Sequence, residues 1–301
     1  MIGSKAKKRT MAARPEGRVS LPTPVVDITP PGLPTGVTVL AKLEGLNPGL
    51  SVKDRVARYM VDRALRDVED PASVTLVEAS SGNTAMGVAL ASREMGTNAW
   101  LFVPEGSGAS RIKRIADLGA RLTLTPSGEG TTGAQRRAVK AASKNDRTHY
   151  LGQHERTDNL MAHLTSTGPE AWSQTSGKVD MFVAGVGTGG TLLGVGRYLG
   201  ERLENLELVG VVPAEGSNIP GLRFHDPDTV RLHGLVDPGI LLRVTEQEAT
   251  LWKRWIESNL SVPVGPSSGA AMAGVVKAAR DLDRGVVLTI FPDHGFNYLG
   301  G

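Results

Sequence analysis

One lysine stands where the sequence predicts the first turn of a helix. Ser51, Lys53 and Asp54 follow a run of turn-forming residues, and Ser51 and Asp54 have the spacing of a capping box with Ser51 as the N-cap. The positive end of the helix dipole lowers the pKa of a lysine in this position. An amine with a lowered pKa can attack a carbonyl and form a Schiff base. The alternative is a surface lysine paired with Asp54 or a neighbouring acid.

Three polar, glycine-bearing loops offer groups that could bind anions. Segment 185–191 (Gly-Val-Gly-Thr-Gly-Gly-Thr) opens a predicted helix with free backbone N–H groups and two hydroxyls, which suits a phosphate monoester. Segment 80–84 (Ser-Ser-Gly-Asn-Thr) could hold a substrate carboxylate, and segment 265–269 brings hydroxyls to a third helix start. Ordinary capping also explains the last two loops, and tight strand-to-helix packing also explains the glycines of the first.

The first of these loops also satisfies a dinucleotide-binding pattern. Gly185, Gly187 and Gly190 fit G-x-G-x-x-G, and Glu215 lies 25 residues beyond Gly190 at the end of the next predicted strand. A nicotinamide-dependent oxidoreductase is therefore the alternative from a different class of enzyme. Against it, the motif lies in the middle of the chain and carries two threonines.

Composition excludes several other classes of function. The chain of 301 residues has no cysteine, which rules out disulfides and a cysteine nucleophile, and its six histidines show no metal-binding spacing, so no metal is expected. The formal charge of +3 comes from the first 18 residues, where six bases face one acid, so no nucleic-acid partner is expected. No apolar run reaches the length of a membrane span.

The elements that must position these groups alternate between strand and helix. This order predicts an α/β fold with mostly parallel sheets, in which ligands bind at the carboxyl ends of the strands. A helical stretch from about residue 159 is predicted to be interrupted at Gly168-Pro169, and residues 213–243 are predicted to be irregular. Strands are predicted at 37–43, 74–78, 99–103, 121–125, 148–151, 179–184, 208–212 and 286–291, and helices at 52–68, 84–95, 111–118, 131–143, from about 190, at 246–259 and at 270–282.

Taken together, the motifs resemble the fold type II (β-family) pyridoxal-phosphate enzymes, and within them the cysteine synthases. The resemblance covers the chain from about Pro22 to Tyr298. It is carried by Asn47-Pro48-x-x-Ser51-x-Lys53-Asp54-Arg55, Ser81-Gly82-Asn83-Thr84, Gln153 with Asn159, His163 and Thr167-Gly168-Pro169-Glu170, Gly187-Thr188-Gly189-Gly190-Thr191, and Ser267-Ser268-Gly269. The segment from Glu215 to Arg223 is most similar to B-type cysteine synthases, which accept thiosulfate as well as sulfide.

The resemblance implies a role for each matching residue. Lys53 forms the Schiff base with pyridoxal phosphate and moves the substrate's α-proton, Asn83 contacts the ring oxygen of the cofactor, and Ser267 faces its pyridine nitrogen. The implied phosphate site consists of Gly187, Thr188, Gly189, Gly190 and Thr191. The implied substrate site consists of Ser80, Ser81, Gly82, Thr84 and Gln153, with Arg223 at the entrance.

The resemblance also implies an activity, a domain organisation and an assembly. We expect β-replacement on an O-activated L-serine, through an aminoacrylate, to give L-cysteine or S-sulfocysteine. The nearest alternative is a synthase of another β-substituted alanine. The implied fold has two three-layer α/β domains with the cofactor between them: a smaller substrate-binding domain at 47–156 and a larger domain at 20–46 plus 157–301, after a disordered basic tail at 1–19. A cytoplasmic homodimer is expected.

Some residues depart from the family pattern near the expected entrance. Ser107 and Gly108 stand where the family usually has Met and Ser, and Phe224 stands where B-type enzymes often carry a second arginine. These departures concern the part of the family pattern that bears on the choice of nucleophile.

Overall fold

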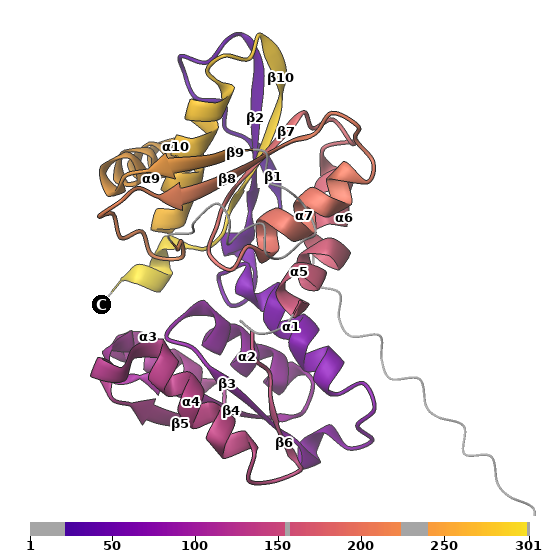
Figure 1. Cartoon of the computed structure of the whole chain (residues 1–301), viewed down its shortest axis with the longest axis vertical. Helices are drawn as coiled ribbons and strands as arrows, with labels where there is room; N and C mark the ends of the chain where they lie inside the picture. The colour runs from indigo at the N-terminus through magenta and orange to yellow at the C-terminus, as the bar shows by residue number, and fades with distance from the viewer. Residues whose placement is uncertain (1–21, 154–156, 224–239, 300–301) are drawn as a thin grey trace, which may run out of the picture.

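The computed structural model describes residues 22–153, 157–223 and 240–299 (Figure 1). The predicted basic tail at 1–19, and Phe224, lie outside these ranges. Within them the chain alternates between strands and helices and forms two separate sheets, which confirms the predicted α/β class.

The larger sheet has six strands in the order β1-β2-β10-β7-β8-β9. Only the edge strand β1 is antiparallel, and every other neighbouring pair is parallel. The central strands are almost wholly buried, as expected for a parallel sheet covered on both faces. The strands are β1 (Val25–Asp27), β2 (Gly36–Leu43), β7 (Met181–Gly185), β8 (Glu207–Pro213), β9 (Ile240–Val244) and β10 (Arg284–Phe291).

Helices cover both faces of this sheet. One apolar core joins it to α9 (Glu246–Leu260) and α10 (Pro266–Ala279), and a second core joins the opposite face to α6 (Gly168–Gln174) and α7 (Gly190–Gly200). Figure 1 shows the two pairs of helices on opposite sides of the strands. This half of the molecule therefore has three layers.

The smaller sheet is fully parallel, in the order β5-β4-β3-β6. Its main core packs one face against α1, α2 and α3, and a small cluster packs the other face against α4. The elements are α1 (Lys53–Ala64), β3 (Thr75–Ala79), α2 (Asn83–Glu94), β4 (Asn98–Pro104), α3 (Ala109–Asp117), β5 (Arg121–Thr125), α4 (Gly130–Ala142) and β6 (Thr148–Tyr150). The predicted domain boundaries fall between the two sheets, and the division into domains stays a prediction.

The predicted capping box before α1 is wrong. The Ser51 hydroxyl does accept the Lys53 N–H at 3.2 Å, but the Asp54 carboxylate accepts the N–H of Gly49 instead of reaching back to Ser51. The backbone of Ser51 is paired with Asp293 in an isolated antiparallel bridge. This bridge, rather than the capping box, holds the chain at the start of α1.

The predicted break at Gly168-Pro169 is also wrong. α5 (Asp158–Ala162) continues through one turn of π-helix (His163–Thr167) directly into α6. Gly168 donates its N–H to the carbonyl of His163, five residues earlier. Proline would clash in a regular α-helix, and the wider turn accommodates it here.

Two further boundaries differ from the prediction. β9 lies in the segment predicted to be irregular, at the edge of the sheet, and only Val244 of its five residues is fully buried. α10 begins at Pro266, so the hydroxyls of segment 265–269 lie in its first turn. That segment follows α9 rather than a strand, and it reaches the end of β10 through a bridge between Val264 and His294.

Candidate active site

A cavity of about 370 Å³ lies where the loops after β3 and β7 meet the start of α1. It is lined by Lys53, Ser80, Ser81, Gly82, Asn83, Thr84, Arg111, Thr131, Gln153, Gly187, Thr188, Pro220, Gly221, Leu222, Arg223 and Tyr298. The structure therefore brings the predicted lysine, the predicted substrate loop and the first residues of the predicted phosphate loop to one place. Gly189, Gly190 and Thr191 continue the phosphate loop into the start of the next helix, and Ser267 lies next to Gly221 of the wall.

Lys53 lies in the first turn of α1 with its side chain in the cavity. Burial lowers the pKa of its amine to about 8, and the positive charge of Arg223 adds to the shift while Asp293 opposes it. Asp54 does not serve as its partner, because the Asp54 carboxylate accepts the N–H of Gly49. The amine is therefore much more often unprotonated at neutral pH than that of an ordinary lysine.

The Ser80–Thr84 loop connects β3 to α2 and presents one face to the cavity. The Thr84 hydroxyl donates to Gln153 Oε1 at 2.6 Å, and both side chains are buried. The Ser80 hydroxyl accepts the N–H of Gly82 at 3.2 Å, which gives the loop a tight turn before the helix. Serine and threonine hydroxyls beside a helix start suit a carboxylate.

The Gly187–Thr191 loop joins β7 to α7. Gly189 has a positive φ of 79°, and no side chain caps the helix, so the first N–H groups of α7 are left for a ligand. A Cβ on Gly190 would lie 2.1 Å from Asn159 Oδ1, so only glycine fits there. Asn159 is buried and its side-chain amide has no hydrogen-bond partner among the described residues.

His163 supports this loop from behind. Its Nε2 lies 3.2 Å from the Thr191 hydroxyl and its Nδ1 lies 2.8 Å from that of Thr167. Burial, with smaller effects of Lys53 and Arg55, lowers the pKa of His163 well below its usual value. The ring is therefore a neutral link between two hydroxyls, which can accept from one and donate to the other.

Ser267 is buried in the first turn of α10 and lies behind Gly221 of the cavity wall. A Cβ on Gly221 would stand 3.4 Å from the Cβ of Ser267, and Gly221 has a φ of +92°. Glycine at 221 thus brings the backbone of the cavity wall close to the serine.

Sequence reasoning missed Asp293, which follows β10 and lies near Lys53. Its Oδ2 accepts from Asn83 Nδ2 at 2.7 Å and from the Tyr298 hydroxyl at 2.6 Å. Burial raises the pKa of Asp293, while Tyr298, Asn83 and Lys53 oppose the rise. The rule that ligands bind beyond the carboxyl ends of parallel strands pointed to Asp293, because the strand before it was predicted.

The arrangement fits pyridoxal phosphate. The uncapped start of α7 and the unpartnered amide of Asn159 suit its phosphate, and the amine of Lys53 suits its aldehyde. Asn83 already gives one N–H to Asp293 and accepts from Asn297 at 3.2 Å, and it keeps a second N–H for a ligand.

Comparison with known proteins places the chain in a class. It belongs to the pyridoxal-phosphate dependent enzymes, whose family pattern it matches over residues 19–293. The predicted family and cofactor are thereby confirmed, and the nicotinamide alternative is not supported.

Comparison with individual proteins shows which enzymes of this family the chain resembles. The chain is 39% identical to cysteine synthase B of Pseudomonas aeruginosa over 269 residues, which covers 88% of this chain and 89% of that protein. It is 37% identical to the cysteine synthase of Aquifex aeolicus over 289 residues, covering 92% and 88%. The crystal structure of an O-acetylserine dependent cystathionine beta-synthase from Helicobacter pylori superposes with a TM-score of 0.83 at 32% identity, covering 93% of this chain and 94% of that one.

Two further observations concern only the part of the chain that the structure describes. In residues 22–153, 157–223 and 240–299, no cluster of three His, Asp or Glu side chains is arranged to hold a metal ion. No helix in these ranges combines the length and apolarity needed to cross a membrane.

Proposed function

We propose that the protein is a cysteine synthase-like transferase that replaces the β-substituent of an O-activated L-serine, with O-acetyl-L-serine as the substrate to test first. The observation that carries the proposal is the position of Lys53, with a lowered pKa, between an anion-binding helix start and a loop of hydroxyl groups. The names of its cysteine synthase relatives support the same reaction.

The cofactor supplies an electron sink that stabilises negative charge at the substrate's α-carbon. Gly187, Thr188, Gly189, Gly190 and Thr191 would hold its phosphate, Asn83 would bind its ring oxygen, and Ser267 would meet its pyridine nitrogen. Serine is neutral, so Ser267 would leave that nitrogen unprotonated, and the cofactor would supply a moderate rather than a strong electron sink. Asn159 adds a donor to the phosphate site.

The amine of Lys53 would hold the cofactor through its aldehyde and would move the α-proton of the substrate. Ser80, Ser81, Thr84 and Gln153, with the backbone of Gly82, hold the substrate carboxylate. Holding the carboxylate on this loop orients the α-proton toward the amine of Lys53. Arg223 lies exposed at the cavity wall, where it meets an anionic substrate.

The assembly and the domain division are part of the same proposal. We expect a homodimer in the cytoplasm, with a smaller substrate-binding domain at 47–156 and a larger domain at 20–46 plus 157–301. Light scattering coupled to size-exclusion chromatography tests the dimer, because the two outcomes differ twofold in mass.

The visible absorption spectrum tests the function. Purified protein loaded with pyridoxal phosphate should be yellow, O-acetyl-L-serine should shift its band to longer wavelength, and sulfide should then restore the band while cysteine appears. A yellow protein that ignores O-acetyl-L-serine but responds to O-phospho-L-serine would change the leaving group. A protein that stays colourless with added cofactor would refute the proposal.

Replacing the lysine gives the matched test. Lys53→Ala should abolish turnover and covalent attachment of the cofactor while the far-ultraviolet circular dichroism stays unchanged, since alanine is well tolerated in a helix. An active Lys53→Ala enzyme would exclude Lys53 from the mechanism.

A further inference from the structure

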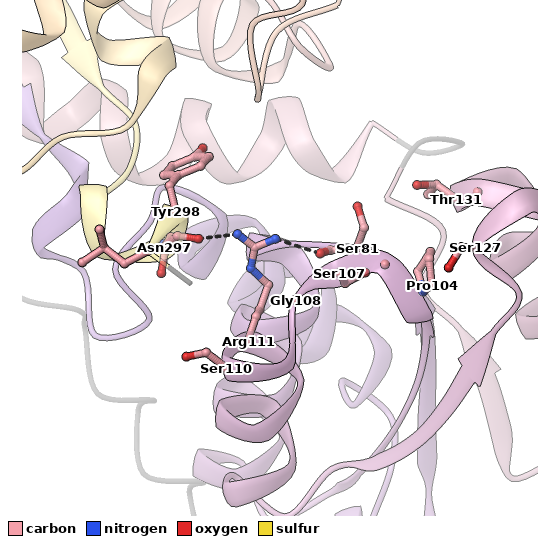
Figure 2. A pocket seen from close by; sticks show the side chains of 13 residues that line it. Ser81, Pro104, Ser107, Gly108, Ser110, Arg111, Ser127, Thr131, Asn297 and Tyr298 are labelled. Carbon is pink, nitrogen blue, oxygen red and sulfur yellow. Dashed lines mark hydrogen bonds between the residues drawn. The ribbon is translucent and has the colours of Figure 1, made fainter. Parts of the chain in front are cut away.

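A second pocket, of about 440 Å³, opens beside the catalytic cavity (Figure 2). The two share Ser81, Arg111, Thr131 and Tyr298 in their walls. A hydrosulfide ion has a single heavy atom, as water does, and water takes about 30 Å³ in the liquid. The second pocket is therefore much larger than the delivery of sulfide requires.

The lining of this pocket is suited to an anion. It carries the hydroxyls of Ser81, Ser107, Ser110, Ser127, Thr131 and Tyr298, one arginine, and no carboxylate. Two helices also begin at its wall, α3 at Ala109 and α4 at Gly130, and neither has a side-chain cap. Their first N–H groups are left for a ligand or for water.

Ser107 is the residue that points most directly to a ligand. The residue is 9% exposed, and its hydroxyl is buried and has no hydrogen-bond partner among the described residues. A buried hydroxyl without a hydrogen-bond partner destabilises the folded protein. A ligand that hydrogen-bonds to it removes this penalty and binds more tightly as a result. Ser107 belongs to the segment that departs from the family pattern.

Arg111 supplies the positive charge. Its guanidinium bridges the pocket by donating to the carbonyl of Ser81 at 3.1 Å and to the carbonyl of Asn297, as the dashed lines in Figure 2 show. Both acceptors are uncharged. Arg114 donates to the side chain of Asn297 at 3.1 Å, and burial followed by the charge of Arg111 lowers its pKa. Arg111 therefore lines the pocket, and Arg114 contacts Asn297, which is another lining residue.

We propose that this pocket binds the carboxylate of the second substrate, which is a small organic thiol rather than sulfide alone. The proposal rests on the proposed function and adds the class of nucleophile. The carboxylate would lie against Ser107, Arg111 and the start of α3, and the shared wall would let the thiol enter the catalytic cavity.

The reaction balances with no further reagent. The C–O bond to the β-carbon of O-acetyl-L-serine breaks and acetate leaves with the bonding electron pair. The sulfur of the thiol forms a bond to the same β-carbon and loses its proton. The α-proton taken by Lys53 returns to the α-carbon, so the products are a thioether amino acid, acetate and one proton.

A matched pair of thiols tests the proposal on the enzyme loaded with its cofactor. 3-Mercaptopropionate and 3-mercapto-1-propanol have the same chain length and differ only in the carboxylate. With O-acetyl-L-serine saturating, and rates corrected for the thiolate fraction, we expect kcat/KM to be at least about tenfold higher for the acid, the effect of one charge-assisted hydrogen bond.

Two sets of variants locate that preference in the pocket. Ser107→Ala removes the unpartnered hydroxyl and should lower the ratio of acid to alcohol several-fold, whereas Ser143→Ala, at an exposed helix end, should keep the wild-type ratio. Arg111→Lys retains the charge and should keep most of the preference, whereas Arg111→Met should lose it. The ratio compares the two thiols on the same variant. A general loss of activity lowers both values of kcat/KM equally and leaves the ratio unchanged.

The outcomes separate this proposal from the proposed function. Equal kcat/KM for the two thiols in an enzyme that makes cysteine from sulfide would refute the pocket and leave the function standing. A preference for the acid that survives both Ser107→Ala and Arg111→Met would also refute it. No spectral response to O-acetyl-L-serine and no product from any thiol would count against the proposed function itself.

Discussion

The reactivity of Lys53 depends on charges that lie far away in the sequence. Burial is the main reason for its lowered pKa, and Arg223 and Asp293 act in opposite directions on it. Its motif identifies the lysine from sequence alone. The contributions of Arg223 and Asp293, which lie 170 and 240 positions further along the chain, cannot be found in that way, because they depend on how the loops meet.

The pH dependence of cofactor attachment reports this pKa. Only the unprotonated amine attacks an aldehyde, so the rate at which protein freed of its cofactor takes up pyridoxal phosphate covalently should rise through a midpoint near pH 8. Arg223→Met removes a like charge and should move the midpoint to higher pH, while Arg147→Met, on an exposed loop, should not. A midpoint near 10 in the wild type would contradict this explanation.

At the scale of elements, a buried cluster of charges joins α1 to the larger sheet. Arg55 of α1 contacts Glu44 at 2.6 Å and Glu170 of α6 at 2.6 Å, and Lys42 of β2 contacts Glu170 at 2.8 Å. Burial alone would raise the pKa of Glu44, but the charge and hydrogen bonds of Arg55 lower it below its usual value. The cluster fixes the helix that carries Lys53.

Removing one carboxylate should expose the energetic importance of this cluster. Glu44→Gln leaves Arg55 with one buried partner fewer and should lower the free energy of unfolding by about 3 kcal/mol at pH 7. Glu201→Gln removes an exposed pair with Arg197 and should cost less than about 0.5 kcal/mol. Equilibrium urea unfolding measures both, and equal effects would contradict the importance of burial.

The lowered pKa of Glu44 determines how the free energy of unfolding changes with pH. Its pKa is lower in the folded protein, so its contribution is fully present above the ordinary carboxyl pKa and is lost as the pH falls through the lowered value. The wild type should therefore lose stability on the acid side more steeply than Glu44→Gln.

Elements with strong local signals were predicted from sequence, and those set by tertiary context were not. β7 is a continuous apolar run and β3 is a short buried strand with Leu76 and Val77 at its centre, and both were found close to their observed ends. β9 was missed because Ile240–Val244 lies at the edge of the sheet and only Val244 is fully buried, so its burial pattern is weak. The π-helical turn before Pro169 was missed because proline normally ends a helix.

The same distinction holds for the site. The glycine- and hydroxyl-rich loops are local in sequence and were predicted as units. Arg111 and Tyr298 reach the cavity only through folding. Asp293 follows a predicted strand, but its contact with Asn83 depends on how distant loops meet. The second pocket could not be predicted either, because its walls come from four separate segments.

At the scale of the whole molecule, the two sheets have separate apolar cores. They meet through the buried charge cluster, through α1 and α5, and through polar contacts around the cavity, such as Asn83 with Asp293. A cofactor held at once by Lys53 and by the start of α7 would link the two halves covalently and electrostatically. The unfolding of the two halves should therefore be coupled more tightly when the cofactor is bound.

Tryptophan fluorescence can test this coupling because of where the four tryptophans lie. Trp100 is in β4 of the smaller sheet, while Trp172, Trp252 and Trp255 belong to helices that pack on the larger one. In Trp100→Phe, fluorescence reports only the larger half, while circular dichroism reports the whole chain.

With cofactor bound, the urea unfolding curves from fluorescence and from circular dichroism should coincide. Without cofactor, the two curves should separate, because the halves then have different stabilities and lack their common ligand. Coincident curves in both forms would mean that the charge cluster alone couples the halves, and Glu44→Gln should then separate them even in the presence of cofactor.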